Sequence, residues 1–92
     1  MTNNTNEYVE KSIISLRESF SMLPEVVNEW DEQDQIDFGM DLGSDLMRLR
    51  QLKQSAQEGQ LNEAHVRKIG ELEHMLQEYS SYLHKLGLRY NN

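Results

Sequence analysis

The sequence predicts an all-α fold, a small helical bundle of three main helices joined by short links. Apolar residues recur at steps of three and four along most of the 92 residues, which is the spacing of one face of an α-helix. Strand-type alternation is nowhere sustained, and one proline and five glycines leave few points at which a helix must break. A chain of this length is expected to form a single domain, residues 1–92, with flexible ends at 1–5 and 88–92.

The first main helix is expected over residues 6–23. Pro24 restricts the conformation of the residue before it, so the helix should end there. Pro24 also suits the first turn of a short helical segment near 24–30. The apolar stripe of the first helix consists of Val9, Ile13, Leu16, Phe20 and Leu23.

The second main helix is expected over residues 32–58, with Asp31 or Asp34 as its N-cap. On a helical wheel it carries two apolar stripes. The first consists of Phe38, Leu42, Leu46, Leu49, Leu52 and Ala56, and the second, here called the methionine stripe, of Ile36, Met40, Gly43 and Met47.

Two interpretations of the methionine stripe are open. In the first, the helix is central in the bundle and both stripes belong to the core. In the second, the methionine stripe meets a second subunit or a partner protein, and the four-residue spacing of Gly39 and Gly43 lets another backbone approach closely.

The third main helix is expected over residues 62–87, with Asn62 as its N-cap and Gly87 just beyond its C-terminus. The link before it is short, so the second and third helices should form an antiparallel hairpin. The regular three- and four-residue spacing of the apolar residues in the first and third helices resembles that of coiled coils. This spacing favours a homodimer. The apolar seam of the third helix consists of His65, Ile69, Leu72, Leu76, Tyr79, Leu83 and Leu86.

The negative charge of the chain is concentrated in one block. The net charge is -7, and no basic residue lies between Glu18 and Met47. Such a surface favours basic partners and disfavours nucleic acid and anionic membranes. Its central part, here called the acidic edge, follows one side of the second helix and is either a solvated face or a docking surface. The acidic edge consists of Asp34, Asp37, Asp41 and Asp45.

Catalytic and metal-binding patterns are weak. There is no cysteine, no glycine-rich phosphate loop and no serine in a nucleophile motif. Glu71 and His74 have the Glu-x-x-His spacing of helical di-iron bundles, but those sites need a second such motif. His65 is in the helical seam, which is typical of a packed histidine at a helix end. We therefore expect no enzyme, no cofactor and no metal.

The sequence also favours a soluble, cytoplasmic protein. The N-terminal residues are polar and do not resemble a secretory signal. No segment approaches the roughly 18 apolar residues of a membrane span. The basic residues Arg48, Arg50 and Lys53 lack interleaved aromatic residues, so no direct binding of nucleic acid is expected.

Two hypotheses about function follow. The first is a non-enzymatic protein-interaction module (an adaptor, inhibitor or antitoxin-like protein) that docks its acidic edge on a basic partner surface. The alternative is a structural or chaperone-like homodimer that presents an apolar helical groove to a client helix. The first hypothesis gives Asp34, Asp37, Asp41 and Asp45 as partner-binding residues, and the alternative gives Met40 and Met47.

Overall fold

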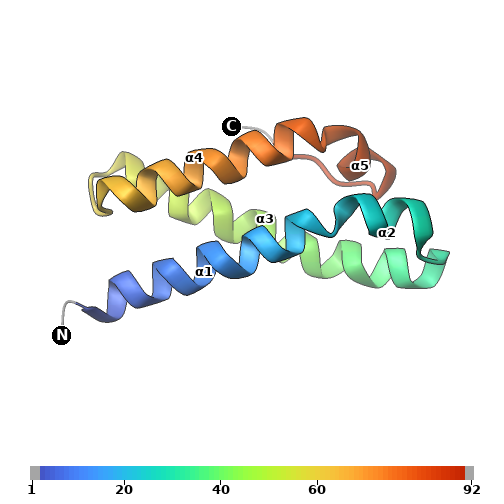
Figure 1. The fold of residues 1–92 in the computed structure, drawn as a ribbon, viewed down its shortest axis with the longest axis horizontal. Helices are drawn as coiled ribbons and strands as arrows, with labels where there is room; N and C mark the ends of the chain where they lie inside the picture. Colours follow the sequence, from blue (N-terminus) through green and yellow to red (C-terminus); the bar gives the residue numbers. More distant parts are fainter. Residues whose placement is uncertain (1–2, 91–92) are drawn as a thin grey trace.

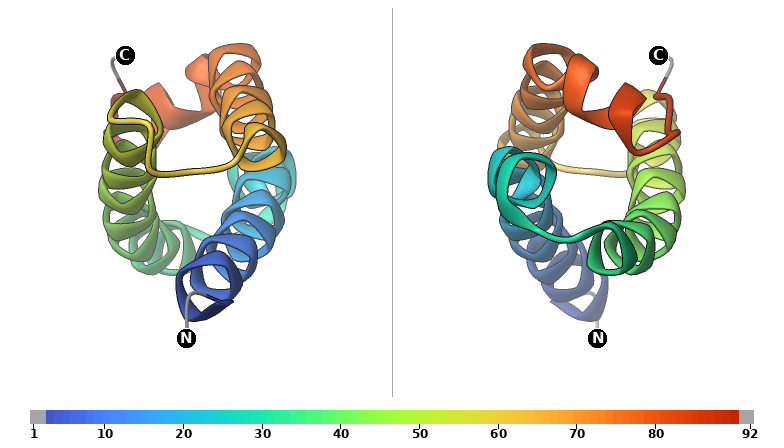
Figure 2. Two further views of the ribbon diagram at one scale, coloured as in Figure 1. Left: turned by 90° about the vertical axis from the view of Figure 1, so that its left-hand side faces the viewer. Right: turned by 90° about the vertical axis from the view of Figure 1, so that its right-hand side faces the viewer.

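The computed structural model describes residues 3–90, which form five helices around one hydrophobic core. The all-α prediction is confirmed. In Figure 1 and Figure 2, α1 and α4 lie side by side and run parallel, while α3 runs antiparallel to both along the other side of the molecule. The helices are α1 (Asn3–Ser21), α2 (Leu23–Glu29), α3 (Glu32–Gln57), α4 (Glu63–Glu78) and α5 (Ser80–Lys85).

The core is built from the predicted apolar stripes. Each helix contributes the residues that recur at three- and four-residue steps, because that spacing keeps them on one face. The first stripe of α3 faces the stripes of both α1 and α4. The buried residues of the cluster are Val9, Ile13, Leu16, Phe20, Leu23, Leu42, Leu46, Leu49, Leu52, Ile69, Leu72, Leu76 and Leu83.

The helix expected over residues 6–23 ends two residues earlier than predicted, at Ser21. Pro24 has no N–H to continue the α-helical ladder, and Met22 instead donates to the carbonyl of Ser19 at 3.2 Å, in a tighter turn. Leu23 therefore opens α2, with Pro24 in its first turn. Leu23 remains fully buried, so the boundary moves without changing the core.

The helix expected over residues 62–87 is interrupted at Tyr79, between α4 and α5. The backbone of Tyr79 is turned away from helical geometry, with φ -99° and ψ 18°. Ser80 and Ser81 follow, and serine pairs are a recurring site of helix kinks. The bend brings α5 against α2, where Leu83 is buried.

Gly87 ends α5 as predicted, and it does so through a Schellman motif. Its φ is 75°, a conformation that residues with a Cβ adopt only at a cost. Gly87 donates its N–H to the carbonyl of His84 at 3.0 Å, and Leu88 donates to Leu83 at 2.9 Å. This pair of bonds satisfies the last carbonyls of the helix and reverses the chain.

The residues after Gly87, here called the C-terminal strap (88–90), return over α4 and α3. Leu88 and Tyr90 fall in the segment expected to be flexible, and the structure packs both against the core. The Tyr90 hydroxyl donates to Glu73 Oε2 at 2.8 Å, and the Arg50 guanidinium lies 5.3 Å from the centre of the Tyr90 ring. Burial, and then the hydrogen bond to Glu73, raise the pKa of Tyr90.

The corner between α2 and α3 is fixed by side chains that satisfy helix ends. Asp31 is the N-cap of α3, since its Oδ1 accepts from the N–H of Asp34 at 2.9 Å. Gln35 satisfies the C-terminal end of α2. Its amide donates to the carbonyls of Val26, Val27 and Trp30 at 3.1, 3.3 and 2.9 Å. Gln35 therefore caps the C-terminus of α2 from the first turns of α3.

Candidate functional site

The methionine stripe lies outside the core. Met40 is 71% exposed, Met47 59% and Ile36 50%, whereas the four leucines of the other stripe of α3 are buried. Figure 2 shows α3 along one side of the described molecule, with no other helix on its outer side. Of the two interpretations drawn from the sequence, membership of the core does not hold for this stripe within residues 3–90.

The two glycines of α3 have different surroundings. A Cβ on Gly39 would lie 3.8 Å from the carbonyl oxygen of Leu86, so this glycine is covered by the end of α5. A Cβ on Gly43 would meet nothing within 4 Å. Only Gly43 is therefore open to an approaching helix, and it lies between Met40 and Met47.

The acidic edge lies between the methionine stripe and the buried stripe of α3, and Asp37 is its member nearest to the methionines. Asp34, Asp37 and Asp41 are exposed, and Asp45 is half-buried. Asp37 accepts a hydrogen bond from Gln33 at 3.2 Å. No ion pair involves these four carboxylates within the described residues. The structure thus brings all six predicted partner-binding residues onto one helix, with the acids along one side of the stripe.

A shallow groove of about 380 Å³ crosses the middle of this surface. It contains Met40, Gly43 and Met47, and three residues that the sequence analysis did not assign to a site: Ser44, Arg48 and Gln51. Arg48 follows Asp41 by seven residues, nearly two full helical turns. This spacing in the sequence indicates that Arg48 lies on the same side of the helix as Asp41. The structure gives Arg48 no ion-pair partner between residues 3 and 90.

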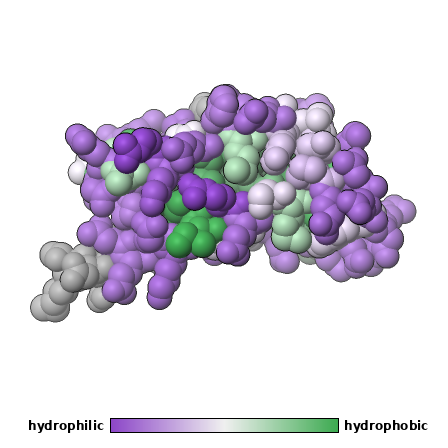
Figure 3. All heavy atoms as spheres, viewed as in Figure 1, coloured by the Kyte–Doolittle hydropathy of each residue, from purple (hydrophilic) through white to green (hydrophobic). Residues whose placement is uncertain are grey.

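The face formed by α1 and α4, on the far side from α3, is different. In Figure 3 it is largely hydrophilic, with its most hydrophobic area near the middle. Ion pairs span the two helices there, including Arg17 with Glu71 at 3.5 Å. Some of the charges on this face therefore bridge α1 and α4.

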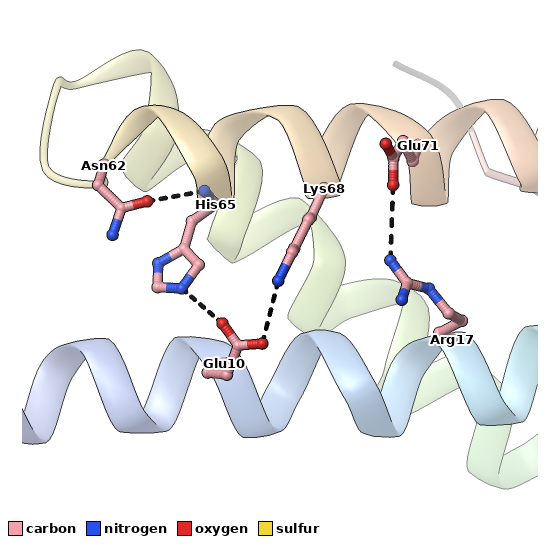
Figure 4. A network of polar contacts seen from close by, with 6 residues as sticks. All are labelled: Glu10, Arg17, Asn62, His65, Lys68 and Glu71. Atoms are coloured by element: carbon pink, nitrogen blue, oxygen red, sulfur yellow. Dashed lines mark hydrogen bonds and ion pairs between the residues drawn. The ribbon is translucent and has the colours of Figure 1, made fainter.

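The polar network of Figure 4 joins Glu10 of α1 to two residues of α4. His65 Nε2 donates to Glu10 Oε1 at 2.9 Å, and Lys68 Nζ lies 3.2 Å from Glu10 Oε2. His65 is buried, and its Nδ1 has no hydrogen-bond partner among the described residues. The N-cap Asn62 accepts from the backbone N–H of His65 at 2.8 Å, which confirms the predicted start of the helix. His65 thus has a structural role at an interhelix contact.

This network makes stability sensitive to acid. The hydrogen bonds from His65 and Lys68 lower the pKa of Glu10 below its usual 4.5. A carboxylate with a lowered pKa stabilises the fold above the unfolded-state pKa, and this stabilisation is lost as the pH falls through the lower, folded-state pKa. We expect wild type to be more stable than Glu10→Gln at neutral pH, with the difference shrinking below about pH 4.5. Urea unfolding of both proteins between pH 7 and 3 measures this difference in stability.

Glu7→Gln is the control for this prediction. Glu7 is exposed on the same helix and makes no ion pair with the described residues. Its replacement should leave the pH dependence of wild type in place. A stability difference between wild type and Glu10→Gln that stays constant down to pH 3 would rule out the assignment to Glu10.

The basic residues near the hairpin turn are mostly held by contacts within the chain. Lys53 Nζ pairs with Glu73 Oε2 at 3.1 Å, Arg50 lies over the Tyr90 ring, and Lys68 pairs with Glu10. They hold the strap and α1 in place. Between α4, α5 and the strap a half-open cleft of about 500 Å³ remains, with a mixed polar and apolar lining.

The Glu-x-x-His motif is divided between separate surface contacts. Glu71 pairs with Arg17, and His74 Nε2 lies 3.7 Å from Glu78 Oε1. Among residues 3–90, no three His, Asp or Glu side chains gather closely enough to hold a metal ion. In the same range, no helix combines the length and the apolar character that crossing a membrane requires.

Comparison with known proteins adds no relative: no protein-family model, no curated protein and no solved structure matches this chain.

Proposed function

We propose that this protein is a non-enzymatic protein-interaction module whose binding surface is the outer side of α3. The exposure of Met40 and Met47 carries the proposal. Neighbouring apolar side chains left in water on one helix mark an interaction surface, and methionine adapts to the shape of a partner. Because the stripe is long and narrow, a helix of the partner fits it best.

The acidic edge defines the chemistry of the partner. Asp37 and Asp41 lie beside the stripe and are free of ion pairs within the described chain. A partner helix seated on Met40 and Met47 would pass these carboxylates, so basic side chains on its flank are favoured. Complementary charge of this kind sets orientation and association rate more than affinity.

Site-specific photo-crosslinking in an extract of the native host tests the proposal. A benzophenone amino acid at position 40 should give adducts with protein. The same group at position 21, where Ser21 of α1 is also exposed, should give few. Adducts at position 40 should decrease when Asp34, Asp37, Asp41 and Asp45 are changed together to asparagine, and also at high salt.

A second set of four substitutions controls for net charge. Glu18, Glu29, Glu58 and Glu63 are exposed outside the acidic edge, and changing them to glutamine removes the same charge. Their replacement should preserve the adducts. If position 40 gives no adduct above the level of position 21, the outer side of α3 is not a binding surface.

The alternative function, a chaperone-like protein with an apolar groove for a client helix, is favoured by the methionine stripe alone. The two functions differ in their dependence on charge. Adducts that are abolished by Met47→Asp but unaffected by the four asparagine substitutions and by salt would favour the client-helix function.

A further inference from the structure

We infer that the helix which occupies the methionine stripe is α3 of a second copy of this chain, packed antiparallel across a two-fold axis beside Gly43 and Ser44. This inference rests on the proposed function and names its partner. A protein with an acidic edge needs a basic partner surface, and α3 itself supplies one. Its Arg48 lines the same groove as Met40 and Met47.

The spacing along α3 is self-complementary. Met40 and Met47 are equally far from the midpoint between Gly43 and Ser44. A two-fold axis at that point therefore places Met40 of each copy against Met47 of the other, so the contact occurs twice. Gly43 lies beside the axis, where the two helices come closest, and the space next to it is open. The apolar contact is thus built from the exposed residues of the stripe.

The charges fit the same arrangement. Asp37, Asp41 and Arg48 lie on one side of the stripe, since separations of seven and eleven residues are close to whole numbers of helical turns. A two-fold axis across antiparallel helices brings that side of both copies together. At a rise of 1.5 Å per residue, Arg48 of the second copy comes level with the gap between Asp37 and Asp41, about 3 Å along the axis from each.

A parallel pairing fits less well. A two-fold axis parallel to the helices would place the acidic side of each copy against the opposite side of the other copy's stripe. Arg48 of one copy would then lie away from Asp37 and Asp41 of the other, and neither set of opposite charges would form. The antiparallel pairing forms both sets, so the charge pattern of α3 favours that direction of packing.

Sedimentation equilibrium of the purified full chain tests the inference. Wild type should be a dimer with a measurable dissociation constant. Met47→Asp should raise that constant by roughly 30-fold or more, as expected for a residue at the centre of an interface. Circular dichroism should show an unchanged fold, since Met47 is exposed in the monomer. Met22→Asp is the matched control. Met22 lies in the turn just before α2 and is also exposed, so this change should leave the dissociation constant unchanged.

Charge exchange tests the antiparallel arrangement. One variant carries Asp37→Lys and Asp41→Lys, and the other carries Arg48→Glu. Each alone should dimerise at least about 10-fold more weakly than wild type, because each pairs like charges. An equimolar mixture should recover dimers, since each copy then faces opposite charges at both ends of the interface.

Three results would overturn the inference. Wild type could sediment as a monomer at every concentration, Met47→Asp could dimerise as well as wild type, or the mixed charge variants could fail to recover dimers. A monomeric wild type that still gives position-40 adducts with another protein would overturn the second copy as partner and leave the proposed function standing. Absence of all adducts at that position would remove both.

Discussion

Replacing Ile13 with alanine is expected to lower the free energy of unfolding by about 2–5 kcal/mol, the range for truncating a buried isoleucine. Ile13 is fully buried at the centre of the α1 stripe, in the cluster shared with α3 and α4. The total stability of a chain of this length is about 5–14 kcal/mol, so the variant loses a large share of it. Thermal unfolding followed by circular dichroism should shift down by roughly 10 °C or more.

The next residue, Ile14, provides the control for this prediction. Ile14 is the same residue type on the same helix but is 47% exposed. Ile14→Ala leaves no cavity in the core and improves helix propensity slightly, so it should change stability by less than about 1 kcal/mol. Equal destabilisation by the two changes would mean that α1 is rotated relative to the arrangement described.

Replacing Gln35 is expected to have the second largest effect. Gln35→Glu keeps the shape of the side chain but removes the amide that donates to three carbonyls at the end of α2. The carboxylate would face those carbonyl oxygens with the same sign of charge. Leaving such groups unsatisfied costs about 1–3 kcal/mol, and the loss should be greatest at the corner between α2 and α3.

Trp30 reports on that corner directly. It is the only tryptophan of the chain, its carbonyl is one of the acceptors of Gln35, and its ring packs edge-on against Phe38 at 5.7 Å. Tryptophan fluorescence should therefore change before the helical signal as Gln35→Glu is unfolded in urea. Gln51→Glu, at an exposed position near the middle of α3, should unfold like wild type. Coincident transitions in Gln35→Glu would show that the cap does not hold the corner.

The helices and the core could be predicted from the sequence because both depend on local spacing. The stripe of Val9, Ile13, Leu16 and Phe20, and the N-cap Asn62, required no knowledge of the neighbouring helices. The predictions differ from the structure where a distant element decides the outcome. The bend at Tyr79 brings α5 against α2, and no pattern within residues 62–87 encodes that surface.

The stripe and the edge that form the candidate site could be predicted from the sequence, but their exposure and their neighbours could not. A helical wheel separates the methionine stripe from the core stripe, yet exposure depends on which side of α3 the other helices occupy. The same holds for the glycines, because Gly39 is covered by Leu86, forty-seven residues later in the chain. Contacts such as Tyr90 with Glu73 join residues through the fold and leave no periodic signal.

The parallel packing of α1 on α4 has a consequence for the order in which the chain can assemble. Glu10 and His65 are separated by 55 residues, so joining these helices closes a long loop, whereas α3 and α4 meet across a short turn. The entropic cost of closure rises with loop length, and short-range contacts form faster. A hairpin of α3 and α4 is therefore less costly to form first than the pair of α1 and α4, and α1 completes the core by docking onto leucines that this hairpin leaves open to water.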